Sequence, residues 1–538
     1  MPCTRSSRIG SRTFWNSLTN QKRSGWIFQP EFFTTKRAVN WGFTIDLASI
    51  RCYNENNKEK GGFFVNNKPG YMTTFRERLS FWTYFIGQNI YYNLTAIFLA
   101  TYLLMQGVDE WKVSLVLLIV KVWDAINDPI FGYIFDKIKF KNGQKSLPWI
   151  RISVALIPIV TIALFAIPKG LSDTGKLIWM AIAYMLWDTV YTLTDVPAYS
   201  MLNTMTDNQD ERRTLLSINR VFSGAGYLIC FVGYPLLISR AIAMSTTLAV
   251  AILAIFSAIT MLPLCLFCKE RNYHPEEEGD AFTPLQMMRY LKQNKYLLIF
   301  YGGYCATDAL KTFNSVSLFA SFYLFGDELF GTIVTMLSMV PGAIIALFMP
   351  AIFRKWDKMK VLMVCNIASV VLGFAIFFAG WENKTLFMVL SVIRCIPLNI
   401  CGILYFMSTP DCAEYGQYRS GISAKGITFA IQTFSVKITG AVSSALAIAL
   451  LGVFRWVEVE ADEFSELVKL AEAGFRQPPE ALNGLWIVYA LVPVIGMLIS
   501  TFFFMAYKLR DKDVQIMAKC NAGELTREQA DKQLSRKY

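Results

Sequence analysis

Residues 112–135 read KVSLVLLIVKVWDAINDPIFGYIF, an apolar run that carries few charges. A helix of this length crosses ~30 Å of hydrocarbon, the thickness of a bilayer core. Comparable runs recur at 149–168, 241–268 and 360–380. Each segment in lipid must satisfy its own backbone polar groups, so these runs should be helices. The composition agrees, with 54% hydrophobic and only 17% charged residues. The sequence therefore predicts an all-α integral membrane protein.

Twelve membrane-spanning helices follow from this pattern. Their expected ranges are 79–105, 112–135, 149–168, 175–203, 214–238, 241–268, 295–325, 328–353, 360–380, 384–409, 422–453 and 482–508. A longer polar stretch follows the sixth helix and divides the set into six and six. Two six-helix bundles are typical of the major facilitator fold.

The expected organisation has five parts. They are an N-terminal extension, a first bundle, a central cytoplasmic loop, a second bundle and a cytoplasmic tail, at 1–75, 76–268, 269–294, 295–508 and 509–538. The extension is polar and basic and contains no spanning run. We expect it to be either a disordered tail or an upstream extension that is not translated, with Met72 as the true start.

The distribution of charge gives an orientation. The net charge is +12, but the basic residues cluster in short loops such as 137–145, which is the positive-inside pattern and not a nucleic-acid surface. The loops after helices 2, 4, 6, 8 and 10 are basic, and those after helices 1, 7 and 11 are acidic. We therefore expect a multi-pass plasma-membrane protein with both termini in the cytoplasm. The outer loop 454–481 has helical character and no assigned role.

Several kinds of chemistry find no support. The single histidine, His274, lies in a polar loop, and no phosphate-binding glycine loop or sizeable soluble domain is present. Most cysteines lie inside apolar runs, where they act as small apolar residues, and the Cys265–Cys268 pair has no second pair beside it. An enzyme is therefore not expected, although a membrane enzyme or sensor is the rival from another class.

The second helix carries charges where charges are costly. Asp124 and Asp128 are four residues apart on one helix face with Asn127 beside them, and they would repel each other unless a cation or a proton lay between them. The fourth helix adds Thr192 and Asp195, with Asp188 as a further acid. Carboxylate, amide and hydroxyl oxygens suit a small hard cation, so these side chains predict an intramembrane cation site.

An alternative is that these carboxylates pair with basic residues and only join helices. The candidates for such pairs are Lys121, Arg220 and Lys437. Lys437, on the eleventh helix, would reach the acidic cluster across the two bundles. On the seventh helix, Asp308 and Lys311 are three residues apart and are expected to pair with each other.

Four motifs in order resemble the glycoside–pentoside–hexuronide:cation symporters, a family of the melibiose-permease type. They are Trp123-Asp-Ala-Ile-Asn-Asp-Pro129 followed by Gly132-x-x-x-Asp136, Tyr191-Thr-Leu-Thr-Asp-Val-Pro197, Asp411-Cys-Ala-Glu-Tyr-Gly-Gln-Tyr418, and Gln432-Thr433 with Lys437. The third is similar to the family's loop after the tenth helix. The resemblance covers about Leu79 to Arg510.

The resemblance implies coupling to Na⁺, Li⁺ or H⁺, with no other cofactor. It places the cation at Asp124, Asn127, Asp128, Thr192 and Asp195, and Na⁺ in particular at the three carboxylates. The substrate would lie on helices 1, 4 and 11, near Gln88, Asn89, Trp123, Asp195, Tyr199, Arg220, Thr433 and Lys437. Gly132 and Asp136 would belong to the inner gate.

Two positions depart from the family's type member. Gln88 and Asn89 stand where that member has a lysine followed by a sugar-binding aspartate, and Tyr199 stands where it has a tryptophan. The cation site is therefore expected to be intact and the sugar site altered. The expected function is cation-coupled symport of a glycoside, pentoside or uronide by a monomer working through alternating access. The alternative is a carrier of a non-sugar substrate on the same scaffold.

Overall fold

The computed structural model describes residues 71–138, 140, 143–271, 290–421, 425–461, 463–536 and 538. The predicted N-terminal extension up to residue 70, and residues 272–289 of the predicted central loop, therefore lie outside the described residues. Residues Phe64–Tyr538 form one compact unit by their contacts, and every helix named below belongs to it.

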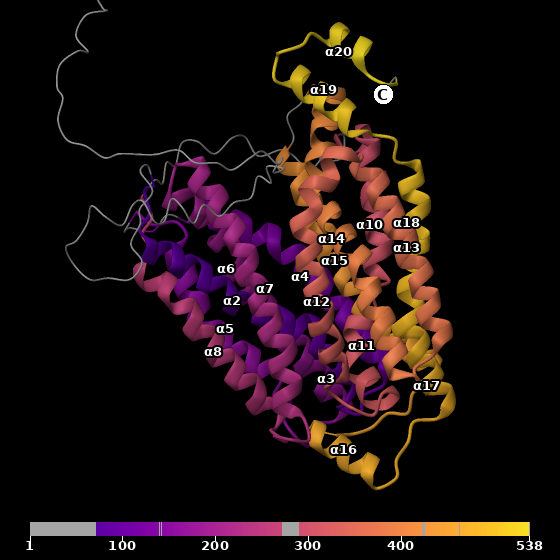
Figure 1. Ribbon diagram of the computed structural model, residues 1–538. Coiled ribbons are helices and arrows are strands. Elements are labelled where there is room, and N and C mark those ends of the chain that lie inside the picture. Colours follow the sequence, from indigo (N-terminus) through magenta and orange to yellow (C-terminus); the bar gives the residue numbers. More distant parts are fainter. Residues whose placement is uncertain are drawn as a thin grey trace, which may run out of the picture. The chain divides into compact units, whose positions relative to one another are not determined.

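The described structure consists of helices joined by loops (Figure 1). The first half contains α2 (Phe75–Asn93), η1 (Leu94–Phe98), α3 (Leu99–Leu104), α4 (Glu110–Lys137), α5 (Leu147–Leu164), α6 (Asp173–Met205), α7 (Gln209–Ile238) and α8 (Thr246–Phe267). The second half contains α10 (Lys295–Ala309), α11 (Phe313–Phe319), η2 (Ala320–Leu324), α12 (Phe330–Lys355), α13 (Lys358–Ala379), α14 (Lys384–Ser420), α15 (Lys425–Val453), α16 (Phe464–Glu472), α17 (Pro479–Trp486), η3 (Ile487–Leu491), α18 (Val492–Ala506), α19 (Asp511–Asn521) and α20 (Arg527–Gln533).

Short polar residues begin several of these helices, because the first N–H groups of a helix have no partner inside it. Thr74 and Glu77 form a capping box at the start of α2. Asp109 accepts a hydrogen bond from the backbone of Lys112 at 3.0 Å, and Ser172 caps α6 in the same way. These capping residues therefore fix where α2, α4 and α6 begin.

The helices pack into two groups. α2 lies against α7 and α8, and α5 lies against α6 and α8; in the second half, α10 and α13 lie against α18, and α14 lies against α12 and α13. The most extensive contact between the groups joins α4 to α15. Helix 1 consists of α2, η1 and α3, and helix 7 consists of α10, α11 and η2. Each is the first span of its half, and each contains a π-helical turn, η1 or η2. This arrangement is the expected one of two helix bundles.

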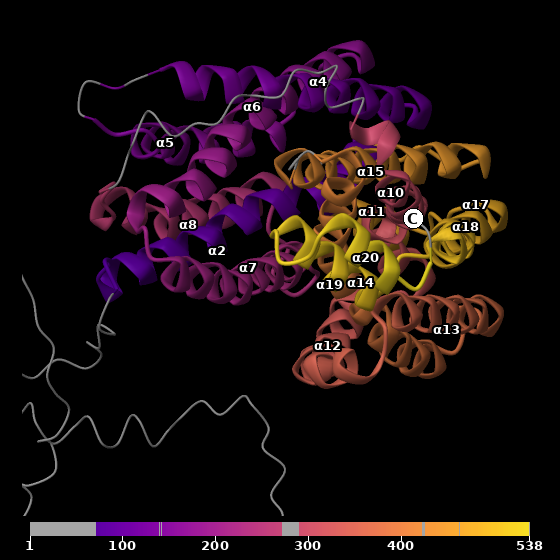
Figure 2. The same cartoon turned by 90° about the horizontal axis from the view of Figure 1, so that it is seen from above.

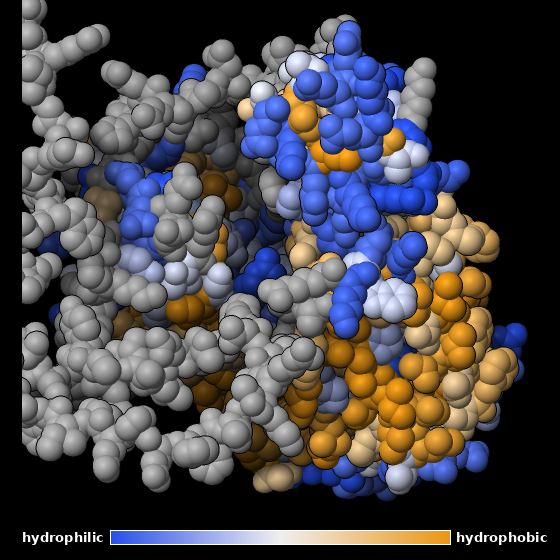
Figure 3. Space-filling view, turned by 45° about the horizontal axis from the view of Figure 1, so that its top comes forward, coloured by the Kyte–Doolittle hydropathy of each residue, from blue (hydrophilic) through white to orange (hydrophobic). Residues whose placement is uncertain are grey.

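Among the described residues, eight helices are long and apolar enough to span a membrane by length and composition. The ends of the predicted ranges agree with those of helical segments to within a few residues, except that α14 continues to Ser420. The structure is therefore consistent with twelve spans. Apolar side chains such as Val371 and Phe378, 61% and 79% exposed, point outward where lipid would lie. Figure 3 shows hydrophobic residues covering the side of the second half below a hydrophilic end at α19 and α20.

Two expectations about the second half were wrong. The motif Asp411–Tyr418 was expected in a loop, but it lies in α14, which continues to Ser420. Its polar side chains are held there by a docked tail: Asn521 of α19 donates to Glu414 at 2.8 Å, and Tyr418 donates to Asp531 of α20. Figure 2 shows α19 and α20 lying over the end of α14. Helical geometry therefore extends beyond the apolar run because the tail supplies partners for it.

The second wrong expectation concerns the seventh helix, which is interrupted between α10 and α11. Asp308 accepts a hydrogen bond from Thr439 at 2.6 Å, and Lys311 lies over the ring of Phe313. Within the described part of the chain these two charged residues form no ion pair with each other. The predicted helical character of the loop 454–481 is confirmed by α16.

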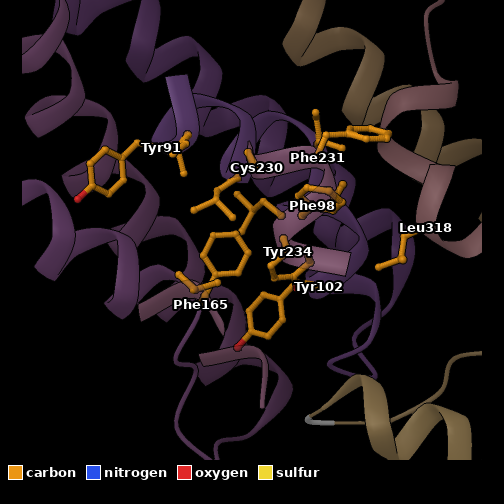
Figure 4. Close-up of a cluster of buried hydrophobic side chains, with 14 of the residues drawn as sticks. Tyr91, Phe98, Tyr102, Phe165, Cys230, Phe231, Tyr234 and Leu318 are labelled. Atoms are coloured by element: carbon orange, nitrogen blue, oxygen red, sulfur yellow. The ribbon is translucent and has the colours of Figure 1, made fainter. Parts of the chain in front are cut away.

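We call the end that carries loops 105–109 and 454–478 the outer end, after the orientation that the charges predict. One hydrophobic cluster fills much of the first half and continues into the outer part of the second half. Figure 4 shows part of it, including Phe98, Tyr234 and Leu318. The rings of Phe98 and Tyr234 lie 4.5 Å apart. A separate cluster around Tyr296 and Phe300 belongs to the second half alone. Shared apolar packing between the halves is thus concentrated at the outer end.

A close helix crossing in the first half gives a test of the packing. A Cβ on Gly87 would lie 2.3 Å from the carbonyl oxygen of Ser257 on α8, so Gly87→Ala must push the two backbones apart. We expect this change to cost about 1–3 kcal/mol and to lower the melting temperature of the purified protein. Gly402→Ala in α14 is the control, since a Cβ there meets nothing within 4 Å. Equal melting temperatures for the two variants would contradict the crossing.

Candidate functional site

The predicted cation residues of α4 and α6 face each other in the middle of the first half. Asn127 donates to the hydroxyl of Thr192 at 3.0 Å, and its Nδ2 lies 3.5 Å from Oδ2 of Asp188. Asp124, Asn127, Asp188 and Thr192 are all buried. Asp188 and Thr192 are four residues apart on one face of α6, and the Thr192 hydroxyl also donates to the backbone carbonyl of Asp188. The structure therefore brings polar side chains from two helices together.

Asp188, a further acid of the fourth helix that was not among the predicted ligands, also belongs to this group. Its side chain meets Asn127, which makes it a neighbour of the predicted ligands. The signal was available in the sequence, because Asp188 and Thr192 have the same four-residue spacing as Asp124 and Asp128. For Asp128, the structure describes the backbone within α4 and nothing of the side chain.

Asp124 forms a contact between the two halves. The ammonium of Lys437, on α15, lies 3.2 Å from Oδ1 of Asp124, and the two side chains are 28% and 6% exposed. Of the three basic partners considered from the sequence, Lys437 is the one shown to meet Asp124. A carboxylate this deeply buried needs an opposite charge, a proton or a cation nearby.

Asp195 lies further along α6 and faces helix 1. Its Oδ1 accepts a hydrogen bond from the side-chain amide of Gln88 at 2.5 Å. Asn89 donates to the carbonyl of Phe85 and to the side-chain oxygen of Gln88, at 2.9 and 3.3 Å. Gln88 is thus in direct contact with the fourth-helix aspartate, and Asn89 contacts Gln88. Trp123 lies beside Asp124 in α4, and its indole nitrogen is 3.4 Å from the hydroxyl oxygen of Thr189 on α6.

The remaining predicted residues occupy different parts of the molecule. Tyr199 is exposed, with its ring 5.1 Å from that of Phe85. Arg220, on α7, is also exposed, and its guanidinium lies 6.0 Å from the ring of Phe406 on α14. A Cβ at Gly132 would meet nothing within 4 Å. Thr433 and Asp136 lie in α15 and α4, and their side chains lie outside what the structure describes.

Polar contacts close the outer end. Lys176 of α6 reaches Glu460 at 2.7 Å, and Thr101 of α3 donates to the carbonyl of Ser315 at 3.0 Å. Arg240, after α7, lies 3.8 Å from Glu328, before α12. Ser114 of α4 donates to the carbonyl of Ala445 on α15 at 2.8 Å. Each of these contacts joins the first half to the second. Figure 1 shows the helices diverging toward the opposite end, which carries α19 and α20.

Two helix bundles, charged side chains buried between their helices, and polar contacts that close one end together define a membrane transporter of the major facilitator class. The family described as MFS/sugar transport protein matches residues 84–511. The chain belongs to this family.

Individual relatives agree with this assignment. The "Uncharacterized symporter YnaJ" of Bacillus subtilis (strain 168) is 25% identical over 79% of this chain and 91% of its own. The isoprimeverose transporter of Lactiplantibacillus pentosus is 20% identical over 79% of this chain and 88% of its own. Among solved structures, the nucleoside transporter NupG superposes with a TM-score of 0.56 at 14% identity, over 80% of this chain and 98% of that one. This last likeness supports the fold alone.

The contact between Lys437 and Asp124 can be tested with a double-mutant cycle. Lys437→Met removes the positive charge beside a buried carboxylate, and we expect it to destabilise the purified protein by about 2 kcal/mol, between the values for exposed and buried pairs. Adding Asp124→Asn should recover most of this loss, because the charge that needed the lysine is gone. Thermal unfolding of both single variants and the double variant gives the coupling. Additive effects would mean that the two residues do not interact.

Proposed function

We propose that the protein is a secondary active transporter that couples the movement of a cation to that of a sugar or glycoside through alternating access. The observation that carries the proposal is the group of buried oxygen ligands between α4 and α6, next to a lysine supplied by the other half. A cation bound among carboxylates offsets their repulsion, and a hydroxyl and an amide complete a set that suits a small hard ion.

The proposed cation site contains Asp124, Asn127, Asp128, Thr192 and Asp195, to which we add Asp188. The ion would be Na⁺, Li⁺ or H⁺. The relative named a symporter supports coupling to an ion without indicating which one. Lys437 would compete with the cation for Asp124, so loading the site would weaken a contact that joins the two halves. This competition is how cation binding would be communicated to the movement of the halves.

The proposed substrate is a glycoside, pentoside or uronide, which would be bound between the halves. The family description and the relative named for isoprimeverose support a sugar. Gln88, Asn89, Trp123, Asp195, Tyr199, Arg220, Thr433 and Lys437 are the proposed contacts. Rings with a few polar groups are the usual lining of a sugar site. The pairing of Gln88 with Asp195 would present an amide and a carboxylate together to sugar hydroxyls.

The proposed working unit is a monomer in the plasma membrane with both termini in the cytoplasm. Its moving parts would be residues 76–268 and 295–508, joined by 269–294 and followed by the tail 509–538. With the outer end closed and the helices diverging at the other end, the arrangement corresponds to an inward-facing state. Gly132 and Asp136, near the cytoplasmic end of α4, would belong to the inner gate.

Uptake into proteoliposomes tests coupling and substrate together. Labelled glycosides, pentoses and uronates would each be offered with an inward Na⁺ gradient, with a proton gradient and with neither. We expect accumulation of one class that requires one gradient. Accumulation that is independent of any gradient would contradict symport, and accumulation of non-sugars alone would overturn the proposed substrate.

Thr192→Val tests the cation site, because it removes one oxygen ligand while preserving the volume of the side chain closely. We expect the cation concentration for half-maximal uptake to rise roughly tenfold, because each lost ligand weakens a site of this kind. By linkage, the cation should then increase substrate affinity by a smaller factor at any fixed cation concentration. Thr194→Val is the matched control, since its hydroxyl bonds the backbone carbonyl of Val190 on the same helix. Equal cation dependence in both variants would remove Thr192 from the site.

Gln88→Met tests the altered substrate site. The change removes the amide that donates to Asp195 while preserving the length of the side chain. We expect the KM for substrate to rise roughly tenfold, the size of one lost hydrogen bond to a charged group. The half-saturating cation concentration should change much less. A change confined to cation dependence would instead assign Gln88 to the cation site.

A further inference from the structure

Three carboxylates from the two halves meet at the outer end. Asp109 and Glu110 stand at the start of α4, and Glu458 follows α15. One carboxylate oxygen from each lies within 4.8 Å of the others. None of the three belongs to the cation site proposed above, which lies about 14 residues further along α4.

Glu110 is the most informative of the three. Its side chain is only 6% exposed, and its Oε1 is buried without a hydrogen-bond partner. A buried carboxylate oxygen that lacks a donor is costly, and such groups in proteins are normally paired or bound to a metal. The other two carboxylates of the group offer only negative charge to it. Three neighbouring carboxylates therefore favour a positive charge among them.

Two basic residues of the outer region are engaged in other contacts. Lys176 donates to Glu460 and to the carbonyl of Gln106, at 2.7 and 2.8 Å. Arg455 pairs with Glu480 at 3.2 Å. Oδ1 of Asp109 caps α4 by accepting from the N–H of Lys112. Neither Lys176 nor Arg455 therefore serves as the counter-ion of the three carboxylates.

We propose that Asp109, Glu110 and Glu458 form a binding site for a divalent cation of the Ca²⁺ type. Ca²⁺ binds carboxylate oxygens at roughly 2.3–2.6 Å, so two of its ligands lie at most about 5.2 Å apart, and the observed separations fit this limit. Mg²⁺, with ligands at about 2.0–2.1 Å, demands a stricter octahedral geometry and keeps more of its waters, so it suits a group of three carboxylates less well. Water fills the remaining positions on the exposed side, where Glu458 lies.

The site joins the halves, because Asp109 and Glu110 belong to the first and Glu458 to the second. Close by, the backbone of Ala461 donates to the carbonyl of Met105 at 2.8 Å, which fixes the same two segments against each other. A cation bound here stabilises the state in which the outer end is closed. On the proposed alternating-access cycle, outside Ca²⁺ would therefore slow the opening of the carrier to the outside.

Binding is measured on the full-length protein in detergent, with CaCl₂ as the probe after treatment with EDTA. We expect one Ca²⁺ per chain with a Kd on the order of 10⁻⁴–10⁻³ M, as in extracellular calcium modules. Glu110→Gln and Glu458→Gln should each weaken binding at least tenfold. Glu472→Gln, which removes an exposed carboxylate from α16 at the same end, should bind as the wild type does. No saturable binding by the wild type, or unchanged binding in both site variants, would overturn the site.

Thermal unfolding separates the site from a folding defect. In EDTA, Glu458→Gln should melt at or above the wild type, since it removes repulsion from the group and changes only an exposed side chain. With Ca²⁺ the order should reverse, because the wild type alone gains from binding. A variant that melts lower by the same amount in both conditions would contradict the proposal.

Uptake with Ca²⁺ outside then tests the effect on the cycle. Inhibition in the wild type that is absent in Glu458→Gln supports the link between the halves, and equal inhibition in both contradicts it. Because binding is measured without substrate, failure of the proposed transport function would leave the binding result intact.

Discussion

An ionised carboxylate among membrane-spanning helices must be neutralised by its surroundings, and this requirement organises the middle of the molecule. Asp124 is buried on α4, and the ammonium that lies against it comes from α15 in the other half. Helix-insertion scales put the cost of a charge at the bilayer centre at roughly 2.5–3.5 kcal/mol. Because each half supplies one member of the pair, the position of one half relative to the other determines whether that cost is met. A cation that takes the place of the lysine changes the same balance.

The packing inside one half is tighter than the packing between the two halves. Inside the first half, helix 1 approaches its neighbours so closely that a Cβ on Gly87 or Gly226 would lie within 2.4 Å of a backbone oxygen. Between the halves, the outer end is held by the part of the hydrophobic cluster that both halves share and by single polar contacts such as Lys176 with Glu460 and Arg240 with Glu328. Each of these pairs joins a buried side chain to an exposed one, so solvent screens the attraction on one side and each pair contributes modestly. Tightly packed bundles joined by weak and separable contacts can move as rigid bodies.

Helix 1 carries the departure of the proposed substrate site from the resembling family. The resemblance aligns Gln88 and Asn89 with charged residues of that family's type member, and Gln88 bonds directly to Asp195. An amide satisfies this carboxylate without neutralising its charge, so the pair retains a negative end and a neutral end. Hydrogen-bond preferences at such a site would differ from those of a site with two charges, while the helix packing around it stays the same.

The sequence by itself determined the membrane-spanning helices, their approximate ends and the groups of ligands within one helix. Apolar length predicts a span, and a four-residue spacing places Asp188 with Thr192 on one face whatever surrounds them. Contacts between helices were not determined in this way, because they depend on the rotation and offset of whole helices, which packing sets. Only the tertiary structure placed Lys437 against Asp124, turned Asp308 toward Thr439, and ordered Asp411–Tyr418 as helix beneath the tail. For the same reason it alone brought Glu110 beside Glu458, more than three hundred residues away in the chain.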